Sequence, residues 1–159
     1  MMKRMLSVGV MALTLMTTCV PTFAADGNVG VSAFKPGDGT SIETRTTDKP
    51  KNSEVYDLSV EKKYEFNGRA AYDSLYTDYN FTGCTAYDIQ VSNAKGTNED
   101  PLSVIVYKNP AIGTDKKLKS VTVNGRQTKD FSVSGLNKTD KIFIEFEAPS
   151  HFSGWIDEG

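Results

Sequence analysis

The sequence has 159 residues, of which 38% are hydrophobic and 24% charged, and its formal net charge is −2 at pH 7. A chain of this length forms one domain with its own core, and its mildly acidic charge argues against nucleic acid or an anionic membrane as a partner. Two cysteines and one histidine are too few for a disulfide framework or a zinc site built from those residues. Because no phosphate-binding glycine loop or dinucleotide motif occurs either, we predict no metal and no cofactor.

The first 24 residues have the three parts of a secretory signal peptide. Residues 1–4 carry positive charge, a run of apolar residues diluted by Ser and Thr follows, and Pro21 precedes small residues with a cleavage site near Ala24. A membrane-spanning helix needs about 18 to 20 strongly apolar residues, and neither this run nor any later one qualifies. We therefore predict a secreted, extracellular protein without a membrane span.

Removal of this segment changes the mature chain in two ways. The segment contains Lys3 and Arg4 and no acidic residue, so two positive charges are lost and the formal charge moves from −2 to −4. Cys19 leaves as well, so Cys84 remains as the single cysteine and cannot form an intramolecular disulfide. The fold must be stabilised by packing.

Residues 25–53 are rich in Gly, Thr, Asp, Lys and Pro and show no sustained periodicity. We predict a flexible leader or linker, mobile from about Thr40 to Asn52, because its apolar surface is too small to offset the entropy of ordering it. Val29, Val31 and Phe34 can form one short strand at its start.

From residue 54 to residue 159, short runs of alternating apolar and polar residues recur roughly every 8 to 14 residues, separated by clusters of Gly, Asn, Asp and Pro. Short strands with such turns are typical of an antiparallel sandwich. We predict a single all-β domain over 54–159, an immunoglobulin-like or jelly-roll β-sandwich of about seven or eight strands. The runs lie at 54–60, 63–68, 74–81, 85–93, 101–109, 118–125, 130–135 and 141–149. Residues 69–76 are the one stretch expected to form a helical turn.

Asn124-Gly125 is the strongest two-residue signal for a hairpin turn. A plain two-residue loop would place the preceding valines on the opposite face from Phe131, because a one-residue slip inverts every side chain. We therefore predict a three-residue loop or a bulge, with Gly125 or Arg126 in the left-handed conformation. The basic run at 115–119 is interpreted as a sheet edge whose charged side chains oppose pairing with a further strand.

The sequence gives little support to an enzyme. A secreted hydrolase would have to use His151, the single histidine, with Cys84 or a carboxylate. The cysteine is not followed by the helix that would lower the pKa of a catalytic thiol, and no spacing selects a pair among the 20 acidic residues. We predict a non-catalytic protein and keep the hydrolase as an alternative.

In the alternating pattern, Cys84 has the opposite parity to the apolar residues Tyr87, Ile89 and Val91 and therefore belongs to the other face of the strand. A free cysteine packs like a small apolar residue, and secreted proteins seldom leave a thiol open. We predict that Cys84 is buried; the alternative is an exposed thiol that can form dimers.

Two aromatic residues are candidates for ligand binding. Tyr76 has outward parity if Leu75 and Phe81 point inward, and Trp155 lies beyond the last predicted strand. Exposed Tyr and Trp side chains stack on sugar rings or anchor protein partners. The alternative is that the tyrosines fill the core or its rim and that Trp155 caps one end of the sandwich. We predict binding through Tyr76 and Trp155.

These observations lead to one leading function and two alternatives. The leading hypothesis is a secreted, non-catalytic β-sandwich module that binds an extracellular glycan or a protein surface. The alternatives are the hydrolase and a structural or assembly protein that pairs through a sheet edge. In its strand rhythm and in the stretches GLNKTDKIFIEF (135–146) and FSGW (152–155), the second half resembles small β-sandwich modules of secreted bacterial proteins, including those appended to peptidases. This resemblance implies a fold and no functional residue.

Overall fold

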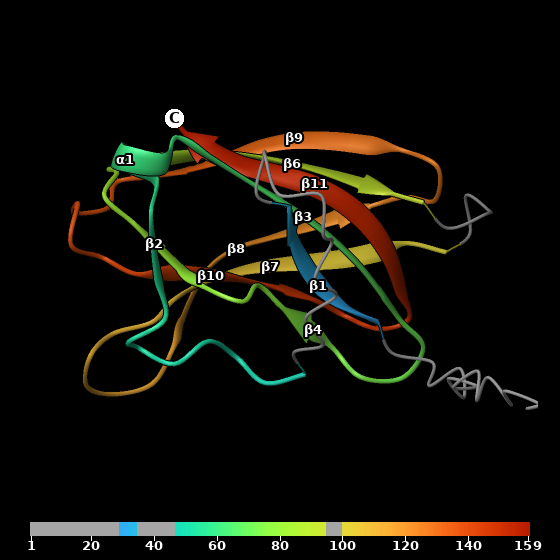
Figure 1. The fold of residues 1–159 in the computed structure, drawn as a ribbon. Helices are drawn as coiled ribbons and strands as arrows, with labels where there is room; N and C mark the ends of the chain where they lie inside the picture. Colours follow the sequence, from blue (N-terminus) through green and yellow to red (C-terminus); the bar gives the residue numbers. More distant parts are fainter. Residues whose placement is uncertain (1–28, 35–46, 95–99) are drawn as a thin grey trace, which may run out of the picture.

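The computed structural model describes residues 29–34, 47–94 and 100–159, so the predicted signal peptide lies outside the described residues. The described residues form two β-sheets packed face to face (Figure 1), which confirms the predicted all-β sandwich. They contain eleven strands rather than seven or eight, because several strands have only two or three residues. No helix in the described part of the chain has the length and apolar character needed to cross a bilayer.

One sheet has five strands, each antiparallel to its neighbours. Their order is β1 (Val29–Phe34), β3 (Lys63–Ala70), β11 (Ser150–Glu158), β6 (Ala86–Asn93) and β9 (Thr128–Ser134). Strand β1 confirms the short strand predicted at the start of the leader. The central strand β11 was not predicted, because only Phe152 and Ile156 mark its inward face with large apolar side chains.

The other sheet has six strands. Their order is β2 (Val55–Asp57), β5 (Asn80–Thr82), β10 (Ile142–Phe146), β7 (Leu102–Lys108) and β8 (Lys116–Val123), and β4 (Leu75–Tyr76) also pairs with β10. Strands β2 and β5 run parallel, and the other neighbours are antiparallel.

The core lies between the two sheets and is built by alternation along the strands. In β3, for example, Tyr64 and Phe66 are buried while Lys63 and Glu65 face outward. Aromatic rings from the two sheets meet in the middle, where Phe146 of β10 stacks on Phe152 of β11 with ring centroids 3.7 Å apart. Complete burial of such a side chain contributes about 1.5–3 kcal/mol to folding.

The run predicted as one strand over 54–60 changes conformation at Asp57. Strand β2 ends there, and Leu58–Glu61 form the single-turn helix α1. The Asp57 carboxylate accepts a hydrogen bond from the backbone N–H of Ser59 at 3.0 Å, as expected of an N-cap, and Leu58 is buried. The helical turn predicted at 69–76 is wrong, because the chain there ends β3 and enters β4.

The predicted run 63–68 ends at Asn67-Gly68, but these two residues lie inside β3, which continues to Ala70. A Cβ added at Gly68 would stand 2.7 Å from the Phe152 ring. The glycine therefore permits close packing inside the sandwich instead of a turn.

The predicted hairpin at Asn124-Gly125 is also wrong, because β8 and β9 belong to different sheets. The turn is tight, with Gln127 N donating to Asn124 O at 3.1 Å, and Arg126 has the predicted left-handed conformation, with φ 59°. Since the two strands face each other across the core, their apolar residues meet there without a bulge.

Strands β8 and β9 lie at corresponding edges of the two sheets. This confirms that the basic run 115–119 lies at a sheet edge. Lys119 Nζ donates to Ser132 O at 2.7 Å, and Lys129 Nζ donates to Thr122 O at 3.2 Å. Lysines of each edge strand thus bind carbonyl groups of the other, and such charged edges oppose pairing with a further strand.

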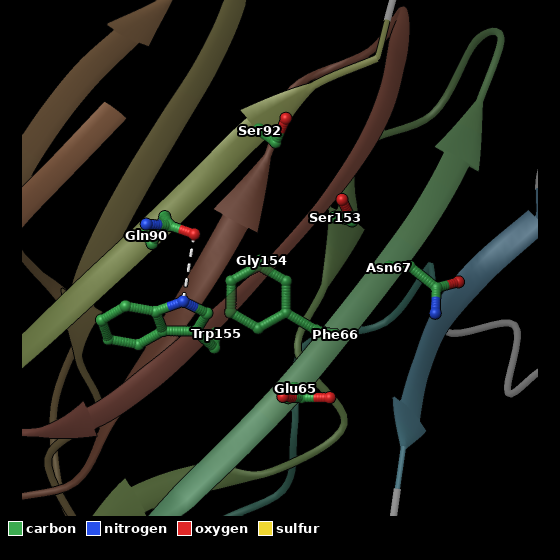
Figure 2. A pocket seen from close by; sticks show the side chains of 8 residues that line it. All are labelled: Glu65, Phe66, Asn67, Gln90, Ser92, Ser153, Gly154 and Trp155. Carbon is green, nitrogen blue, oxygen red and sulfur yellow. Dashed lines mark hydrogen bonds between the residues drawn. The ribbon is translucent and has the colours of Figure 1, made fainter. Parts of the chain in front are cut away.

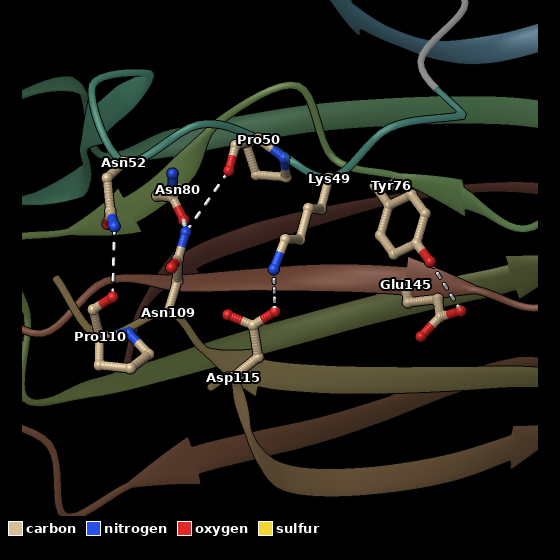
Figure 3. A network of polar contacts seen from close by, with 9 residues as sticks. All are labelled: Lys49, Pro50, Asn52, Tyr76, Asn80, Asn109, Pro110, Asp115 and Glu145. Carbon is tan, nitrogen blue, oxygen red and sulfur yellow. Dashed lines mark hydrogen bonds and ion pairs between the residues drawn. The ribbon is translucent and has the colours of Figure 1, made fainter. Parts of the chain in front are cut away.

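The described end of the predicted leader, residues 47–53, is docked on the six-stranded sheet, which differs from the expected flexibility. Asn80 and Asn109 are buried beneath it, and Asn109 Nδ2 donates to Asn80 Oδ1 at 2.8 Å. Asn80 Nδ2 in turn donates to Lys51 O at 2.7 Å. Asn109 also donates to the carbonyl oxygen of Pro50 (Figure 3), and Pro50 is buried. Paired amides of this kind hold an irregular segment without leaving buried polar groups unsatisfied.

Candidate binding site

The outer face of the five-stranded sheet presents its side chains in rows, because the antiparallel registers set them side by side. The row that contains the tryptophan consists of Glu65, Trp155, Gln90 and Asp130. The next row contains shorter polar side chains: Asn67, Ser153, Ser92 and Thr128. One large side chain therefore stands beside several small ones.

This contrast in size produces a hollow of about 370 Å³ on the outer face (Figure 2). Its lining residues come from β3, β6 and β11: Glu65, Phe66, Asn67, Gln90, Ser92, Ser153, Gly154 and Trp155. We call it the Trp155 hollow. It combines an aromatic ring with carboxylate, amide and hydroxyl groups.

Gly154 is needed where β11 passes β6. A Cβ added at this position would lie 2.1 Å from the carbonyl oxygen of Gln90 and 2.7 Å from the Phe66 ring. A larger residue would therefore push the two strands apart. The glycine next to Trp155 keeps the rows of the outer face in register.

The indole of Trp155 is held in place by a chain of hydrogen bonds across three strands. Its Nε1 donates to Gln90 Oε1 at 3.1 Å, and Gln90 Nε2 donates to Asp130 Oδ1 at 2.8 Å. Figure 2 shows the indole directed from β11 toward Gln90 on β6. Such an orientation lowers the ordering cost of binding a ligand.

Lys63 lies over the tryptophan. Its Nζ is 5.0 Å from the centroid of the Trp155 ring and 3.1 Å from Glu65 Oε1. The side chains of Lys63 and Glu65 are 43% and 44% exposed. A cation–π contact at an exposed site contributes about 0.5–1 kcal/mol and a surface ion pair about 0–1 kcal/mol. Lys63 therefore covers the indole ring but is held there by weak contacts only.

Tyr76, the other predicted binding residue, lies on the outer face of the opposite sheet. Its hydroxyl donates to Glu145 Oε1 at 3.2 Å, and its ring centroid is 6.1 Å from that of Phe143. Burial, followed by the nearby charge of Glu145, raises the pKa of Tyr76 to about 12. The structure does not bring Tyr76 and Trp155 together, and their roles in binding stay predictions.

Trp155 does not cap an end of the sandwich, since it lies within β11 on the outer face. Its neighbours in the hollow were not predicted. The outward parity of Glu65 and Gln90 was visible in the predicted strands. Their position beside Trp155 depends on β11 pairing with both β3 and β6, which local sequence does not contain.

His151 and Cys84 lie far apart. Cys84 is buried next to Tyr87. The backbone N–H of Cys84 donates a hydrogen bond to the Tyr87 hydroxyl at 3.4 Å. Tyr87 pairs with Glu158 at the end of β11, and His151 precedes Glu158 by seven residues on the same strand, roughly 23 Å. This separation excludes a Cys–His hydrolase.

The prediction that Cys84 is buried is confirmed. Burial also raises the pKa of its thiol, the opposite of what a reactive cysteine requires. The opposite parity assigned to Cys84 does not apply, because the chain turns at Gly83, with φ 96°, and β6 begins only at Ala86. In the described ranges, no group of three or more His, Cys, Asp or Glu residues is placed to hold a metal ion.

No protein-family model matches the chain, and no curated protein matches its sequence. Among solved structures, the fold is similar to a CBM4 structure, with 16% identity and a TM-score of 0.36 over 60% of this chain and 67% of the other. It is also similar to TmCBM61 in complex with β-1,4-galactotriose, with 14% identity and a TM-score of 0.28; the match covers 61% of each chain and thus less than two thirds of TmCBM61. A third similar structure is family 16 carbohydrate-binding module-2, with 10% identity and a TM-score of 0.29 over 60% of this chain and 73% of the other. All three TM-scores are below 0.5, so the candidate site rests on the geometry of this chain alone.

Proposed function

We propose that this protein is an exported, non-catalytic module that binds a glycan in the Trp155 hollow. The observation that carries the proposal is a partly exposed indole, fixed on the outer sheet face beside a polar hollow of about 370 Å³. A sugar ring has an apolar C–H face and a rim of hydroxyl groups. An indole offers an apolar surface to the first, and amide, carboxylate and hydroxyl groups pair with the second.

The hollow retains free hydrogen-bonding capacity. A glutamine side chain has two N–H donors and two acceptor positions, and Gln90 uses one of each, toward Asp130 and Trp155. One donor and one acceptor remain for a ligand. Asn67 and Glu65 border the same space and extend the polar rim.

The lining residues favour binding over hydrolysis. Glycoside hydrolysis of the usual kind needs two carboxyl groups on either side of the scissile bond. Of the described residues that line the hollow, Glu65 alone carries a carboxylate. The hollow therefore contains one of the two carboxyl groups that hydrolysis needs. Binding of a glycan without cleavage is the function that fits it.

A protein partner and edge-to-edge assembly fit the molecule less well. A stable protein interface covers about 800 Å² on each partner, far more than this hollow offers. Lysines occupy the facing edges β8 and β9 and oppose strand addition there. Export is a proposal that depends on the signal-like sequence of residues 1–24.

The test is a glycan-array screen of the purified protein, followed by calorimetry with the best oligosaccharide. Trp155→Ala should weaken binding at least about thirtyfold, as loss of a central aromatic anchor does, with an unchanged melting temperature. The matched control is Tyr72→Ala, since Tyr72 is 86% exposed and outside the hollow, and it should bind like the wild type. Absence of any glycan ligand, or a Trp155→Ala variant that binds normally, would overturn the proposal. Release of cleavage products would overturn its non-catalytic part.

A further inference from the structure

The Trp155 hollow lies in an acidic part of the sheet. The row on the other side of the tryptophan contains Lys63, Asp157 and Asp88. The described residues of this row and of the tryptophan row therefore include four carboxylates and one ammonium group: Glu65, Asp88, Asp130 and Asp157, with Lys63. The next cation along β3, Arg69, stands two rows beyond Glu65, roughly 13 Å away. Uronate or sulfate groups would be repelled here.

The single ammonium shows what this place can bind. Lys63 Nζ lies over the indole at 5.0 Å from the ring centroid and 3.1 Å from Glu65 Oε1. An aromatic face next to a carboxylate is the combination by which proteins bind ammonium groups. The protein thus fills the position with a cation of its own.

Lys63 can leave this position at little cost. Its ion pair with Glu65 joins two exposed side chains and is weak in water, and its cation–π contact with Trp155 contributes about 0.5–1 kcal/mol. Asp157 stands directly across from Lys63 in the register of β3 and β11, close enough for a cross-strand ion pair. If Lys63 moves toward Asp157, the indole face and the Glu65 carboxylate become free together.

Building on the proposed function, we propose that the hollow selects glycans with free amino groups. One ligand ammonium displaces Lys63 and binds between the Trp155 ring and the Glu65 carboxylate. A neutral sugar can stack on the indole but gains no ionic contact. An acidic sugar meets the four carboxylates.

Trp155 is the only tryptophan of the sequence, so its fluorescence reports on this site directly. The protein is titrated at about pH 6, where amines are protonated, with an oligosaccharide in free-amino form, its N-acetylated counterpart of equal length and linkage, and a uronate oligosaccharide. We expect the free-amino form to bind about fivefold or more tightly than the N-acetylated form, the uronate to bind weakest, and added salt to reduce the difference.

Two variants test the displacement. Lys63→Met should tighten binding of the free-amino form about three- to tenfold, because the internal competitor is gone. Glu65→Gln should weaken the free-amino form about tenfold and reduce its advantage over the N-acetylated form. Lys117→Met and Glu147→Gln make the same changes at exposed positions outside the five-stranded sheet and should leave the selectivity unaltered.

Equal or tighter binding of the N-acetylated form overturns this inference and leaves glycan binding intact. An unchanged selectivity in Glu65→Gln does the same. If no oligosaccharide binds, in the titration or on the array, the proposed function fails as well.

Discussion

The two outer faces of the sandwich use their aromatic residues differently. On the six-stranded sheet, Phe143 is 1% exposed and stacks on Tyr107 with centroids 5.3 Å apart, while Tyr76 is tied to Glu145. On the five-stranded sheet, Trp155 is partly exposed, as Tyr76 and Tyr107 are, but it stands beside a hollow. The aromatic residues of the first face pack on one another, whereas the tryptophan of the second borders a space that we propose for a ligand.

Outward parity therefore places an aromatic residue on a face but does not say whether it is free. That depends on what the rest of the chain brings to the face. Residues 47–53 are bound to the six-stranded sheet through Asn80 and Asn109 (Figure 3). The corresponding place beside Trp155 contains short polar side chains, so the ring keeps an open neighbourhood.

The two faces should differ most in the free energy of unfolding that is lost when an asparagine side chain is removed from each. Asn80 donates to Lys51 O and Glu54 O and accepts from Asn109, so Asn80→Ala leaves buried groups unpaired and should lower the free energy of unfolding by about 3 kcal/mol. The matched Asn67→Ala, at an exposed position, should cost less than about 0.5 kcal/mol. Urea unfolding measures both. Equal losses would contradict the assignment of structural and binding faces.

The tyrosines should make stability sensitive to alkaline pH. Burial is the main cause that raises the pKa values of Tyr76 and Tyr87 from the ordinary 10.0 to about 12. The folded state thus favours the protonated phenol, so this part of the stability is complete below pH 10.0 and is lost as the pH rises through about 12.

Tyr76→Phe should reduce that alkaline loss and lower the free energy of unfolding at neutral pH by about 1 kcal/mol, since the hydrogen bond to Glu145 is gone. Trp155→Phe, on the other face, should leave the pH dependence unchanged. Urea unfolding at a series of pH values distinguishes the variants. A Tyr76→Phe variant with the alkaline slope of the wild type would contradict the role given to this hydroxyl.

The core between the faces can be tested through its buried thiol. Buried Cys84 should react with a thiol reagent at least about a hundredfold more slowly in the native protein than after unfolding. Asn80→Ala should speed the reaction, because the six-stranded sheet opens more often, and Asn67→Ala should not. Fast stoichiometric labelling of the native wild type would refute the burial of this residue.

Much of the fold could be predicted because alternation is a local property. The apolar positions of β3, β6, β7 and β10 give the inward faces and hence the sandwich. The strand β11 was missed because Gly154 occupies an inward position where a large apolar residue would have marked the pattern. The turn at Asn124-Gly125 was assigned to a hairpin, since a four-residue turn looks the same whether it joins strands of one sheet or of two.

The site could be predicted only in part. Trp155 was singled out by its residue type, but its place on a sheet face was not predicted because β11 was missed. The outward position of Tyr76 was predicted, but Tyr76 lies on the other sheet. The partners of Trp155 were not predicted, because Glu65 and Gln90 come from strands distant in sequence and meet it through the register of a whole sheet. The buried Asn80–Asn109 pair escaped for a similar reason, since a polar side chain is buried only where a distant partner satisfies it.

Backbone amide NMR during addition of the best-binding oligosaccharide shows which face of the sandwich binds it. If the ligand occupies the Trp155 hollow, the shifts concentrate on β3, β6 and β11, at Glu65, Gln90 and the indole N–H of Trp155, while Tyr76 and Glu145 stay unchanged. Shifts confined to the outer face of the six-stranded sheet would contradict binding in the hollow.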